Sequence, residues 1–447
     1  MIHQPLRRSY TGSMLAALLF VFAFTDASDV AAQTRQSWTT SRLKGSPTSP
    51  SEFRIRRAFT KRIFSNPTSI LEIPATNEIL LTQMNGSIFT FSKSDDSVDK
   101  HRVAELAQIA GGGVSLFSAT LHPDFAVNGY LFVCLVHPEE GRHTRVSRFT
   151  TKRNLNGQLL VNSNSERVII KWPAGGHNAG CLQFAPDGLL YISTGDGAGP
   201  NPPDGLTTGQ TVDDLLGAIL RIDVDNMSGD QNYAIPADNP FVGQEDARPE
   251  IYAYGLRNPW KFGIDSTKGD VFVADNGWET WEMVHHVKSG QNCGWPVMEG
   301  RVALRSEVEV GPTPIVPPAR DHHHSEANSV IGGPVYHGEK LSGLDGFFVY
   351  GDYITGTIWA LKPDADGYAY KDVVDTDLRI VDFTQGSKGE LFVLDYDYTG
   401  GIYELLPNDV EDLSENFPRL LSETGLFTSV KDLQPAAGVL PYDVVVP

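Results

Sequence analysis

Short apolar segments alternate with turns over most of this chain. From about Phe53 to about Pro407, the apolar runs are brief and are separated by clusters of Gly, Pro, Asp and Asn. Long stretches with the 3.6-residue periodicity of an amphipathic helix are missing from this region. Brief apolar runs bounded by such turn residues are typical of β-strands. The pattern therefore predicts an all-β domain over residues 53–407.

One strand–turn–strand unit recurs within that domain. Three full copies, EILLTQMNGSIFTF, DGFFVYGDYITGTIWAL and KGELFVLDYDYTGGIYEL, begin at Glu78, Asp345 and Lys388. Three shorter matches are NGYLFVCLV, DGLLYISTGD and KGDVFVADNG. A β-sandwich requires no single recurring unit, whereas a β-propeller repeats one blade around a central channel. We therefore predict a six-bladed β-propeller in which inserted loops make the spacing uneven.

The N-terminal segment has the features of an export signal. Arg7 and Arg8 precede the apolar stretch MLAALLFVFAF, and Val30-Ala31-Ala32 is a small-residue cleavage site. The stretch is shorter than the roughly 20 apolar residues that cross a bilayer as a helix. We therefore predict a signal peptide over residues 1–32, no membrane span after its removal, and a periplasmic or extracellular protein.

Two further segments flank the predicted propeller. Residues 33–52 are rich in Ser and Thr, which favours a linker. Residues 408–447 contain charge and proline but no copy of the repeat. We expect this second segment to be a C-terminal tail or the start of an incomplete module.

Charge and cysteine content narrow the function classes. The formal net charge of −19 argues against nucleic acid as a partner, because a nucleic-acid site needs a basic face. The three cysteines, Cys134, Cys181 and Cys293, form no CxxC pair. A cysteine-based zinc site and a c-type haem attachment are therefore not expected, and at most one disulfide could form.

His177 is the first candidate for chemistry. It opens the stretch HNAGCLQFAPDGLLYISTGDG, in a glycine-flanked loop just before a predicted strand. An imidazole can take up a proton near neutral pH, so the residue suits a general base. A structural loop histidine that bonds to backbone is the equally weighted alternative.

Three other segments carry polar groups in loops. In GLRNPW, Arg257 could bind the carboxylate of a ligand through two parallel hydrogen bonds. The alternative is an ion pair between Arg257 and an Asp or Glu side chain of the protein itself. In ADNGWETWEMVHHV, the oxygen-rich surroundings of Gly277 suit calcium, although such acidic loops are often only solvated. In DHHHSEA, His322, His323 and His324 could bind a transition metal or stand unused at the surface.

Taken together, the segments resemble the glucose/sorbosone dehydrogenase family and its soluble quinoprotein glucose dehydrogenases. The matching stretches include LFSATLHPDFAVNGYLFV, GGHNAGCLQFAPDGLLYISTGDG, IYAYGLRNPWKFGID and GQNCGWPVMEG. They occur in order over nearly all of residues 53–407. The resemblance implies a six-bladed propeller that binds pyrroloquinoline quinone (PQQ) and calcium and oxidises sugar hydroxyl groups.

The resemblance also implies roles for individual residues. His177 falls where the family has its catalytic base. Arg257 and Asn258 match the family's cofactor contacts, and Arg379 matches a residue that grips the cofactor carboxylates. Gly277 and Trp278 match positions whose backbone carbonyl groups hold calcium.

Several positions depart from the family pattern. The residues Gly113, Gly176, Cys181, Ile354 and Asp377 stand where the family has a glutamine, an acid, an arginine, a lysine and a second arginine. The cofactor therefore has fewer positive partners here. No CxxCH motif follows the propeller, so we expect a separate electron acceptor such as a c-type cytochrome.

The sequence leaves three hypotheses for function. The first is an exported PQQ- and calcium-dependent dehydrogenase that acts on a small sugar. The second is a calcium-dependent hydrolase of the sugar-lactonase kind, which needs no electron acceptor. The third is a binding propeller without catalytic activity.

Overall fold

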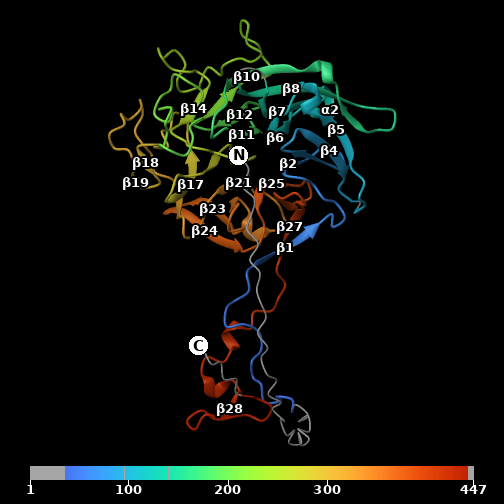
Figure 1. Ribbon diagram of the computed structural model, residues 1–447, viewed down its shortest axis with the longest axis vertical. Helices are drawn as coiled ribbons and strands as arrows, with labels where there is room; N and C mark the ends of the chain where they lie inside the picture. The colour runs from blue at the N-terminus through green and yellow to red at the C-terminus, as the bar shows by residue number, and fades with distance from the viewer. Residues whose placement is uncertain (1–35, 95, 139–140, 441–447) are drawn as a thin grey trace, which may run out of the picture. The chain divides into compact units, whose positions relative to one another are not determined.

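The structure is a computed structural model that describes residues 36–94, 96–138 and 141–440 (Figure 1). The predicted signal peptide lies outside the described residues. The chain divides into two compact units, one formed by residues 51–410 and the other by the segments that flank them. Among the described residues, no helix is long and apolar enough to cross a membrane.

Six β-sheets of the larger unit have four or five strands each, and Figure 1 shows them arranged as blades around a common centre. The first three blades, from the innermost strand outward, are β2 (Pro67–Glu72), β3 (Glu78–Gln83), β4 (Ser87–Ser92) and β5 (His101–Glu105); β6 (Ser115–Leu121), β7 (Tyr130–His137), β8 (His143–Arg153) and β10 (Arg167–Pro173), with β9 (Leu159–Val161) paired to β8; and β11 (Ala179–Phe184), β12 (Leu190–Thr194), β13 (Ala218–Ile222) and β14 (Ile251–Tyr254).

The other three blades follow the same antiparallel order. They are β15 (Lys261–Ile264), β16 (Val271–Asp275), β17 (Trp281–Val287) and β20 (Arg320–His323); β21 (Val330–Val335), β22 (Phe348–Asp352), β23 (Ile358–Asp364) and β24 (Gly367–Val374); and β25 (Ile380–Gln385), β26 (Leu391–Asp395), β27 (Ile402–Pro407) and β1 (Phe53–Ala58). The helices are negligible: α1 (Leu106–Ile109) and α2 (Phe125–Asn128) have four residues each. The all-β, six-bladed prediction is confirmed.

The sixth blade joins the two ends of the propeller. Strand β1 pairs antiparallel with β27, with Phe53 opposite Pro407 and Ala58 opposite Ile402. Figure 1 shows the blue β1 beside the red β27. The first strand of the domain therefore completes the last blade, which closes the ring and leaves no open gap between blades one and six.

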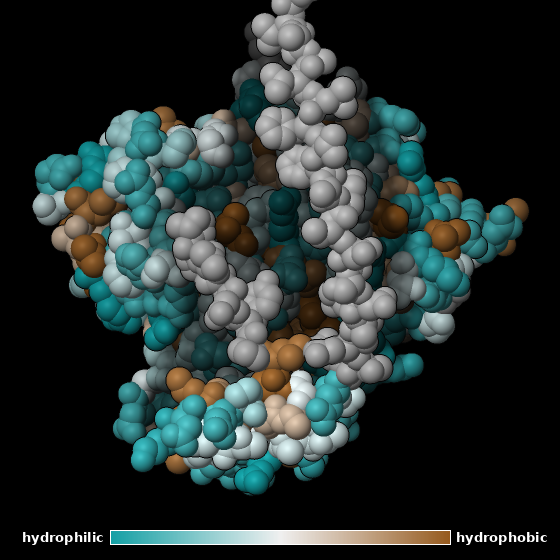
Figure 2. All heavy atoms as spheres, turned by 60° about the horizontal axis from the view of Figure 1, so that its bottom comes forward, coloured by the Kyte–Doolittle hydropathy of each residue, from teal (hydrophilic) through white to brown (hydrophobic). Residues whose placement is uncertain are grey.

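The recurring sequence unit marks the second strand of each blade. The six copies coincide with β3, β7, β12, β16, β22 and β26. These strands are buried because blades cover both of their faces; every residue of β12 and of β16, for example, is buried. Apolar side chains from adjacent blades form the core, as where β10 packs near β12 and β13. Hydrophilic residues dominate the surface shown in Figure 2, with scattered hydrophobic residues among them.

The innermost strands form a ring around the central channel. Each of β2, β6, β11, β15, β21 and β25 contacts the inner strand of the next blade. Because every blade starts with its innermost strand, the loops that lead into these strands meet at one face of the propeller. His177, Arg257, Asn258 and Arg379 all lie in such loops, one to four residues before β11, β15 or β25.

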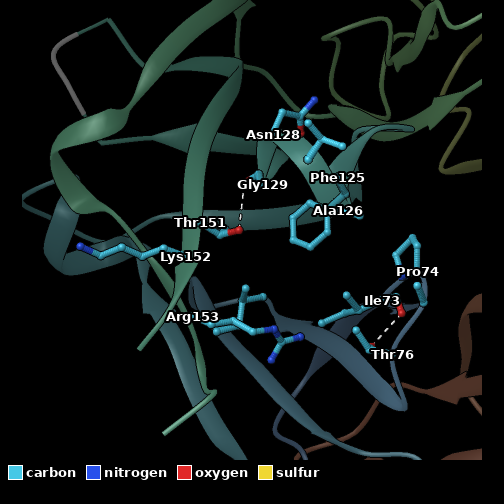
Figure 3. Close-up of a pocket in the computed structure, with 13 residues that line it drawn as sticks. Ile73, Pro74, Thr76, Phe125, Ala126, Asn128, Gly129, Thr151, Lys152 and Arg153 are labelled. Atoms are coloured by element: carbon cyan, nitrogen blue, oxygen red, sulfur yellow. Dashed lines mark hydrogen bonds between the residues drawn. The ribbon is translucent and has the colours of Figure 1, made fainter. Parts of the chain in front are cut away.

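The opposite end of the channel contains a cavity of about 720 Å³. Residues from all six inner strands line it, and Lys261 and Asp382 lie at its inner wall. A second pocket, of about 370 Å³, lies between the loop after β2 and the helix α2 (Figure 3). Neither pocket is lined by the predicted site residues. The three cysteines are buried and free, so none forms a disulfide.

The smaller unit brings the predicted linker and the predicted tail together. Its strands are β28 (Phe427–Ser429) and β29 (Gln434–Pro435). The Arg42 N–H donates to the Thr424 carbonyl at 2.9 Å, and the Trp38 indole donates to the Gly425 carbonyl at 3.1 Å. The two flanks of the propeller thus pair with each other over part of their length.

Candidate active site

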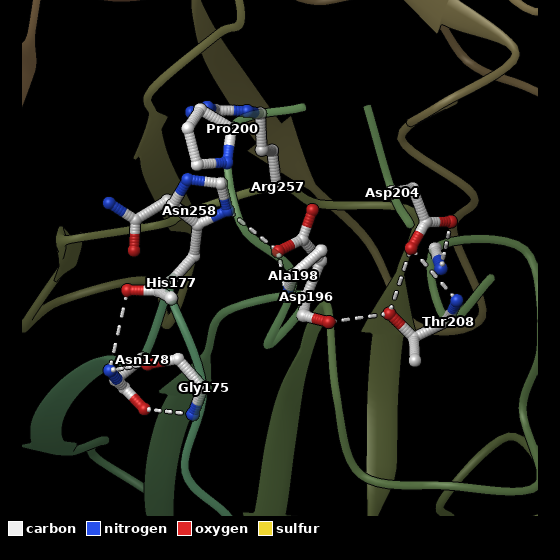
Figure 4. Close-up of polar contacts among 12 residues, drawn as sticks. Gly175, His177, Asn178, Asp196, Ala198, Pro200, Asp204, Thr208, Arg257 and Asn258 are labelled. Atoms are coloured by element: carbon white, nitrogen blue, oxygen red, sulfur yellow. Dashed lines mark hydrogen bonds and ion pairs between the residues drawn. The ribbon is translucent and has the colours of Figure 1, made fainter. Parts of the chain in front are cut away.

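His177 lies in the loop that leads into β11. Its imidazole Nδ1 lies 2.7 Å from Oδ1 of Asp196, which follows β12 in the same blade. The Asp196 side chain is fully buried, whereas 14% of the His177 side chain is exposed. No hydrogen bond reaches the imidazole Nε2 from any described residue. The ring therefore has one nitrogen fixed by a buried acid and the other available to a ligand (Figure 4).

Asp196 is itself held by several donors. The Trp295 indole N–H donates to its Oδ2 at 2.9 Å, and the Ala198 N–H donates to its Oδ1 at 2.9 Å. The Asp196 N–H donates to the Arg257 carbonyl at 2.8 Å, which ties this loop to the one before β15. A buried carboxylate with these partners is fixed in place, so it also fixes the orientation of the imidazole.

The glycines around His177 allow two backbone segments to approach closely. A Cβ on Gly175 would lie 1.8 Å from the Gly197 carbonyl oxygen, and one on Gly176 would lie 2.2 Å from the Ala198 oxygen. A Cβ on Gly195 would lie 2.4 Å from the His177 oxygen. Only glycine fits at these positions without a shift of the facing backbone.

Arg257 and Asn258 lie beside His177 because a second buried carboxylate holds their backbone. The N–H groups of Arg257 and Asn258 donate to Asp275 at 3.0 and 2.7 Å. The Asn258 side-chain oxygen accepts from the Ala179 N–H at 3.2 Å, next to the histidine loop. Burial raises the pKa of the Asp275 carboxyl to about 7, against the lowering effect of those two N–H groups.

The Arg257 guanidinium is mostly buried, and not all of its N–H groups have a hydrogen-bond acceptor. Its Nη1 donates to the Asn276 carbonyl at 3.2 Å, and its carbon lies 5.5 Å from the centre of a Trp295 ring. Its Nε is buried without a hydrogen-bond partner. Burial lowers the pKa of this group, while Asp196 and Asp275 oppose that shift. Figure 4 shows the side chains of His177, Asn258 and Arg257 on one side of Asp196.

Gly277 and Trp278 continue from this cluster, directly after Asn276. The Trp278 indole donates to the Pro200 carbonyl at 2.7 Å. The carbonyl oxygens of Gly277 and Trp278 accept no hydrogen bond from any described residue. Two carbonyl oxygens without protein donors suit a hard cation such as calcium, which takes backbone oxygen ligands.

Arg379 lies on the same face but apart from this cluster. Its N–H donates to Asp395 at 3.0 Å, and its side chain is exposed. Within the described part of the chain, that side chain makes no hydrogen bond or ion pair. The structure thus brings together His177, Arg257 and Asn258 with the 277–278 loop, and it leaves Arg379 free for a ligand.

The histidine-rich segment does not form a metal site in the structure. His322 lies between Tyr350 and Glu326, at 2.8 and 3.1 Å, and His324 bonds to Glu282 at 2.9 Å. His323 is exposed and contacts Ser325. Within residues 36–94, 96–138 and 141–440, no group of three His, Cys, Asp or Glu side chains could hold a metal ion.

The acidic side chains near Gly277 also have other partners. Asp275 holds backbone N–H groups, and Glu282 holds His324. In this loop the backbone oxygens, rather than the carboxylates, are therefore the candidate calcium ligands. The adjacent His285 and His286 face opposite ways, as a strand requires: His285 is buried and His286 stacks on Phe272.

Sequence reasoning missed two acids of the site. Asp196 belongs to the STGDG turn, which resembles an ordinary strand exit, and only its burial next to the histidine reveals its role. Glu299 lies in β18 (Met298–Glu299), yet its carboxylate contacts the 278–281 backbone. The sequence signal for Glu299 is its place in GQNCGWPVMEG, one of the stretches that resemble the family.

Comparison with known proteins gives one family over most of the propeller. The profile of the family described as Glucose / Sorbosone dehydrogenase matches residues 64–404. The HIPL1 protein of Arabidopsis thaliana is 37% identical over 210 residues, which cover 42% of this chain and 30% of that protein. The chain thus spans under a third of the length of this relative. Aldose sugar dehydrogenase YliI of Escherichia coli (strain K12) is 23% identical over 361 residues, which cover 77% of this chain and 91% of that protein.

A solved structure shares the fold. The PQQ-bound form of Aldose Sugar Dehydrogenase from Streptomyces coelicolor aligns with a TM-score of 0.61 at 20% identity, over 81% of this chain and 100% of that one. At this identity the likeness concerns the propeller architecture alone.

Proposed function

We propose, from the premise that this chain belongs to the Glucose / Sorbosone dehydrogenase family, that it oxidises a hydroxyl group of a small sugar with PQQ and calcium. In this proposal His177 is the general base. Arg257, Asn258 and Arg379 bind the cofactor, and Gly277 and Trp278 bind the calcium ion.

The observation that carries the proposal is the pairing of His177 with Asp196 beside Arg257. A carboxylate that accepts from Nδ1–H fixes the neutral tautomer in which Nε2 is the proton acceptor. That nitrogen has no partner among the described residues, so it can take the proton of a sugar hydroxyl group. Asp196 then stabilises the imidazolium, because it is buried and already oriented.

The donors and acceptors present fit the two groups that the family implies. The unpartnered Nε of Arg257 and the exposed side chain of Arg379 provide cations for quinone and carboxylate oxygens. The two uncommitted carbonyl oxygens of the 277–278 loop provide ligands for calcium. When bound, the quinone would supply the hydride acceptor and the cation a Lewis acid, since no side chain accepts a hydride.

The cellular setting is part of the proposal. The N-terminal signal features support export to the periplasm or the outside of the cell. The reduced cofactor would pass its electrons to a separate acceptor such as a c-type cytochrome.

The test is reconstitution of the purified protein. We expect PQQ and calcium together, but neither alone, to give aldose-dependent reduction of an artificial dye. His177→Gln should lower the turnover at least 100-fold, because general bases contribute roughly 10²–10⁴ to rates. Lactone hydrolysis without PQQ would select a hydrolase instead, and no activity with any aldose or lactone would select a binding propeller.

A further inference from the structure

One carboxylate oxygen holds the whole turn that follows Asn276. Glu299 Oε1 accepts from the backbone N–H groups of four successive residues, at distances between 2.8 and 3.1 Å: Trp278, Glu279, Thr280 and Trp281. The Glu299 side chain comes from a different segment, the hairpin of β18 and β19 (Val302–Ala303), and the residue is only 3% exposed. Successive N–H groups that converge in this way form a concave anion site, which an acidic side chain of the protein itself occupies here.

The turn is too tight for any side chain at its first position. A Cβ on Gly277 would lie 1.6 Å from the Trp281 carbonyl oxygen. The backbone of residues 277–281 therefore folds back on itself around the Glu299 oxygen. Its path depends on that oxygen, because the one buried carboxylate oxygen accepts all four of these N–H groups.

We propose that Glu299 is a positioning residue that aims the Gly277 and Trp278 carbonyl oxygens at the calcium ion. The N–H of Trp278 and the carbonyl of Gly277 belong to one planar peptide group, in which the two bonds point in opposite directions. The N–H of Glu279 and the carbonyl of Trp278 are related in the same way. By binding both N–H groups, Glu299 turns both carbonyl oxygens away from itself, toward the side where they accept no hydrogen bond. The inference rests on the proposed function for the identity of the ion.

Two substitutions separate the position of this oxygen from its charge. Glu299→Asp keeps the charge but withdraws the oxygen from the turn by one methylene length. Glu299→Gln removes the charge but keeps an acceptor oxygen within reach of the four N–H groups. The matched control is Glu250→Gln, because Glu250 is equally buried but bonds to Arg248 and Tyr233 in another blade.

The experiment titrates calcium into the full chain, freed of metal, at saturating PQQ, and measures the dissociation constant by calorimetry. We expect Glu299→Asp to weaken calcium binding at least tenfold, because residues that orient metal ligands typically contribute 10–100-fold to affinity. Glu299→Gln and Glu250→Gln should bind calcium within about threefold of the parent. Circular dichroism shows whether each variant is folded, and Glu299→Ala replaces Glu299→Asp if the latter is not.

Each other outcome overturns the inference. If Glu299→Asp or Glu299→Ala binds calcium like the parent, the carboxylate does not position the carbonyl oxygens. If Glu299→Gln binds calcium as weakly as Glu299→Asp, an acceptor oxygen within reach of the four N–H groups is not sufficient, and placement alone does not explain the affinity. If the parent itself binds no calcium while it binds PQQ, the proposed metal site fails and the inference fails with it.

Discussion

At the residue scale, a few buried carboxylates determine what the exposed groups can do. Asp196 holds the imidazole of His177, accepts from Trp295 and donates its N–H to the Arg257 carbonyl. Asp196 therefore sets the tautomer of the His177 imidazole and also connects the His177 loop to the loop of Arg257. The general-base role proposed for His177 thus depends on Asp196 as well as on the imidazole itself.

Asp196→Asn is expected to lower the turnover of the reconstituted protein by about 100-fold or more. An amide can present its N–H to Nδ1 and favour the tautomer in which Nε2 carries the proton and cannot accept one. The KM for the sugar should change much less, because Asp196 is buried behind the ring. Steady-state kinetics with the dye measure both constants. Asp187→Asn, which alters a part-exposed partner of Arg221, is the control and should leave both unchanged.

Asp275 should give the protein a specific pH dependence of stability. Its folded pKa, about 7, lies above its ordinary value of 3.8. Its stabilising contribution is therefore fully present below about pH 3.8 and is lost as the pH rises through about 7. Chemical denaturation gives the free energy of unfolding at pH 5 and at pH 8. The decrease from pH 5 to pH 8 should be larger in the parent than in Asp275→Asn. Equal losses in the two proteins would mean that the carboxyl is ionised throughout this range.

At the element scale, an acid at the end of the second strand recurs in blades four to six. Asp275 ends β16, Asp352 ends β22 and Asp395 ends β26. Each accepts N–H groups from the loop that leads into the inner strand of its own blade. This arrangement explains why the repeat VFVAD, FVYGD and LFVLD carries information about the site: its last residue shapes the loop at the candidate active face.

Asp352→Ala is expected to reduce the free energy of unfolding by about 3 kcal/mol, because four N–H groups lose the buried carboxylate that accepts them. The donors are those of Asn328, Ser329, Ile354 and Thr355. Asp345→Ala, at an exposed position, should cost less than about 0.5 kcal/mol. Urea denaturation measures both changes. A loss for Asp352→Ala no larger than that of the control would contradict this account of the loops.

The sequence predicted the strands better than it predicted the site. The repeat located the second strand of every blade, because apolar alternation and turn residues are local signals. His177, Arg257 and Asn258 were found through loop motifs and a family resemblance. Asp196 and Glu299 were not, because each contacts a partner about 20 residues away in the chain and neither stands out from ordinary turn acids in the sequence.

At the scale of the propeller, two sets of contacts connect the blades to one another. One is the pairing of β1 with β27, which joins the ends of the propeller. The other is Lys261 of β15, whose Nζ donates to the Thr68 carbonyl at 3.0 Å and the Phe117 carbonyl at 3.4 Å, and lies 3.6 Å from Asp382. Strands from four blades thus meet at one ammonium group. The sequence showed no sign of this contact, because Lys261 follows the RNP motif as an ordinary polar residue.

Lys261→Met should destabilise the protein by about 3–5 kcal/mol, because it leaves the Asp382 carboxylate buried without its cation. The double variant Lys261→Met/Asp382→Leu should recover much of that loss, since removal of both charges leaves neither unpaired. Thermal and urea denaturation measure the two effects. If the double variant lost as much stability as the sum of the two single variants, the pair would not be coupled.

The central claim, that this propeller oxidises a sugar with His177 as the base, is tested most directly by a single turnover. The protein loaded with PQQ and calcium is mixed with an aldose without oxygen, and the quinone absorbance is followed in a stopped-flow instrument. We predict complete reduction of the bound quinone in the parent, and a rate at least 100-fold lower in a His177→Gln variant that binds PQQ equally well. Equal rates in the two proteins, or no bound quinone in the parent, would contradict the claim.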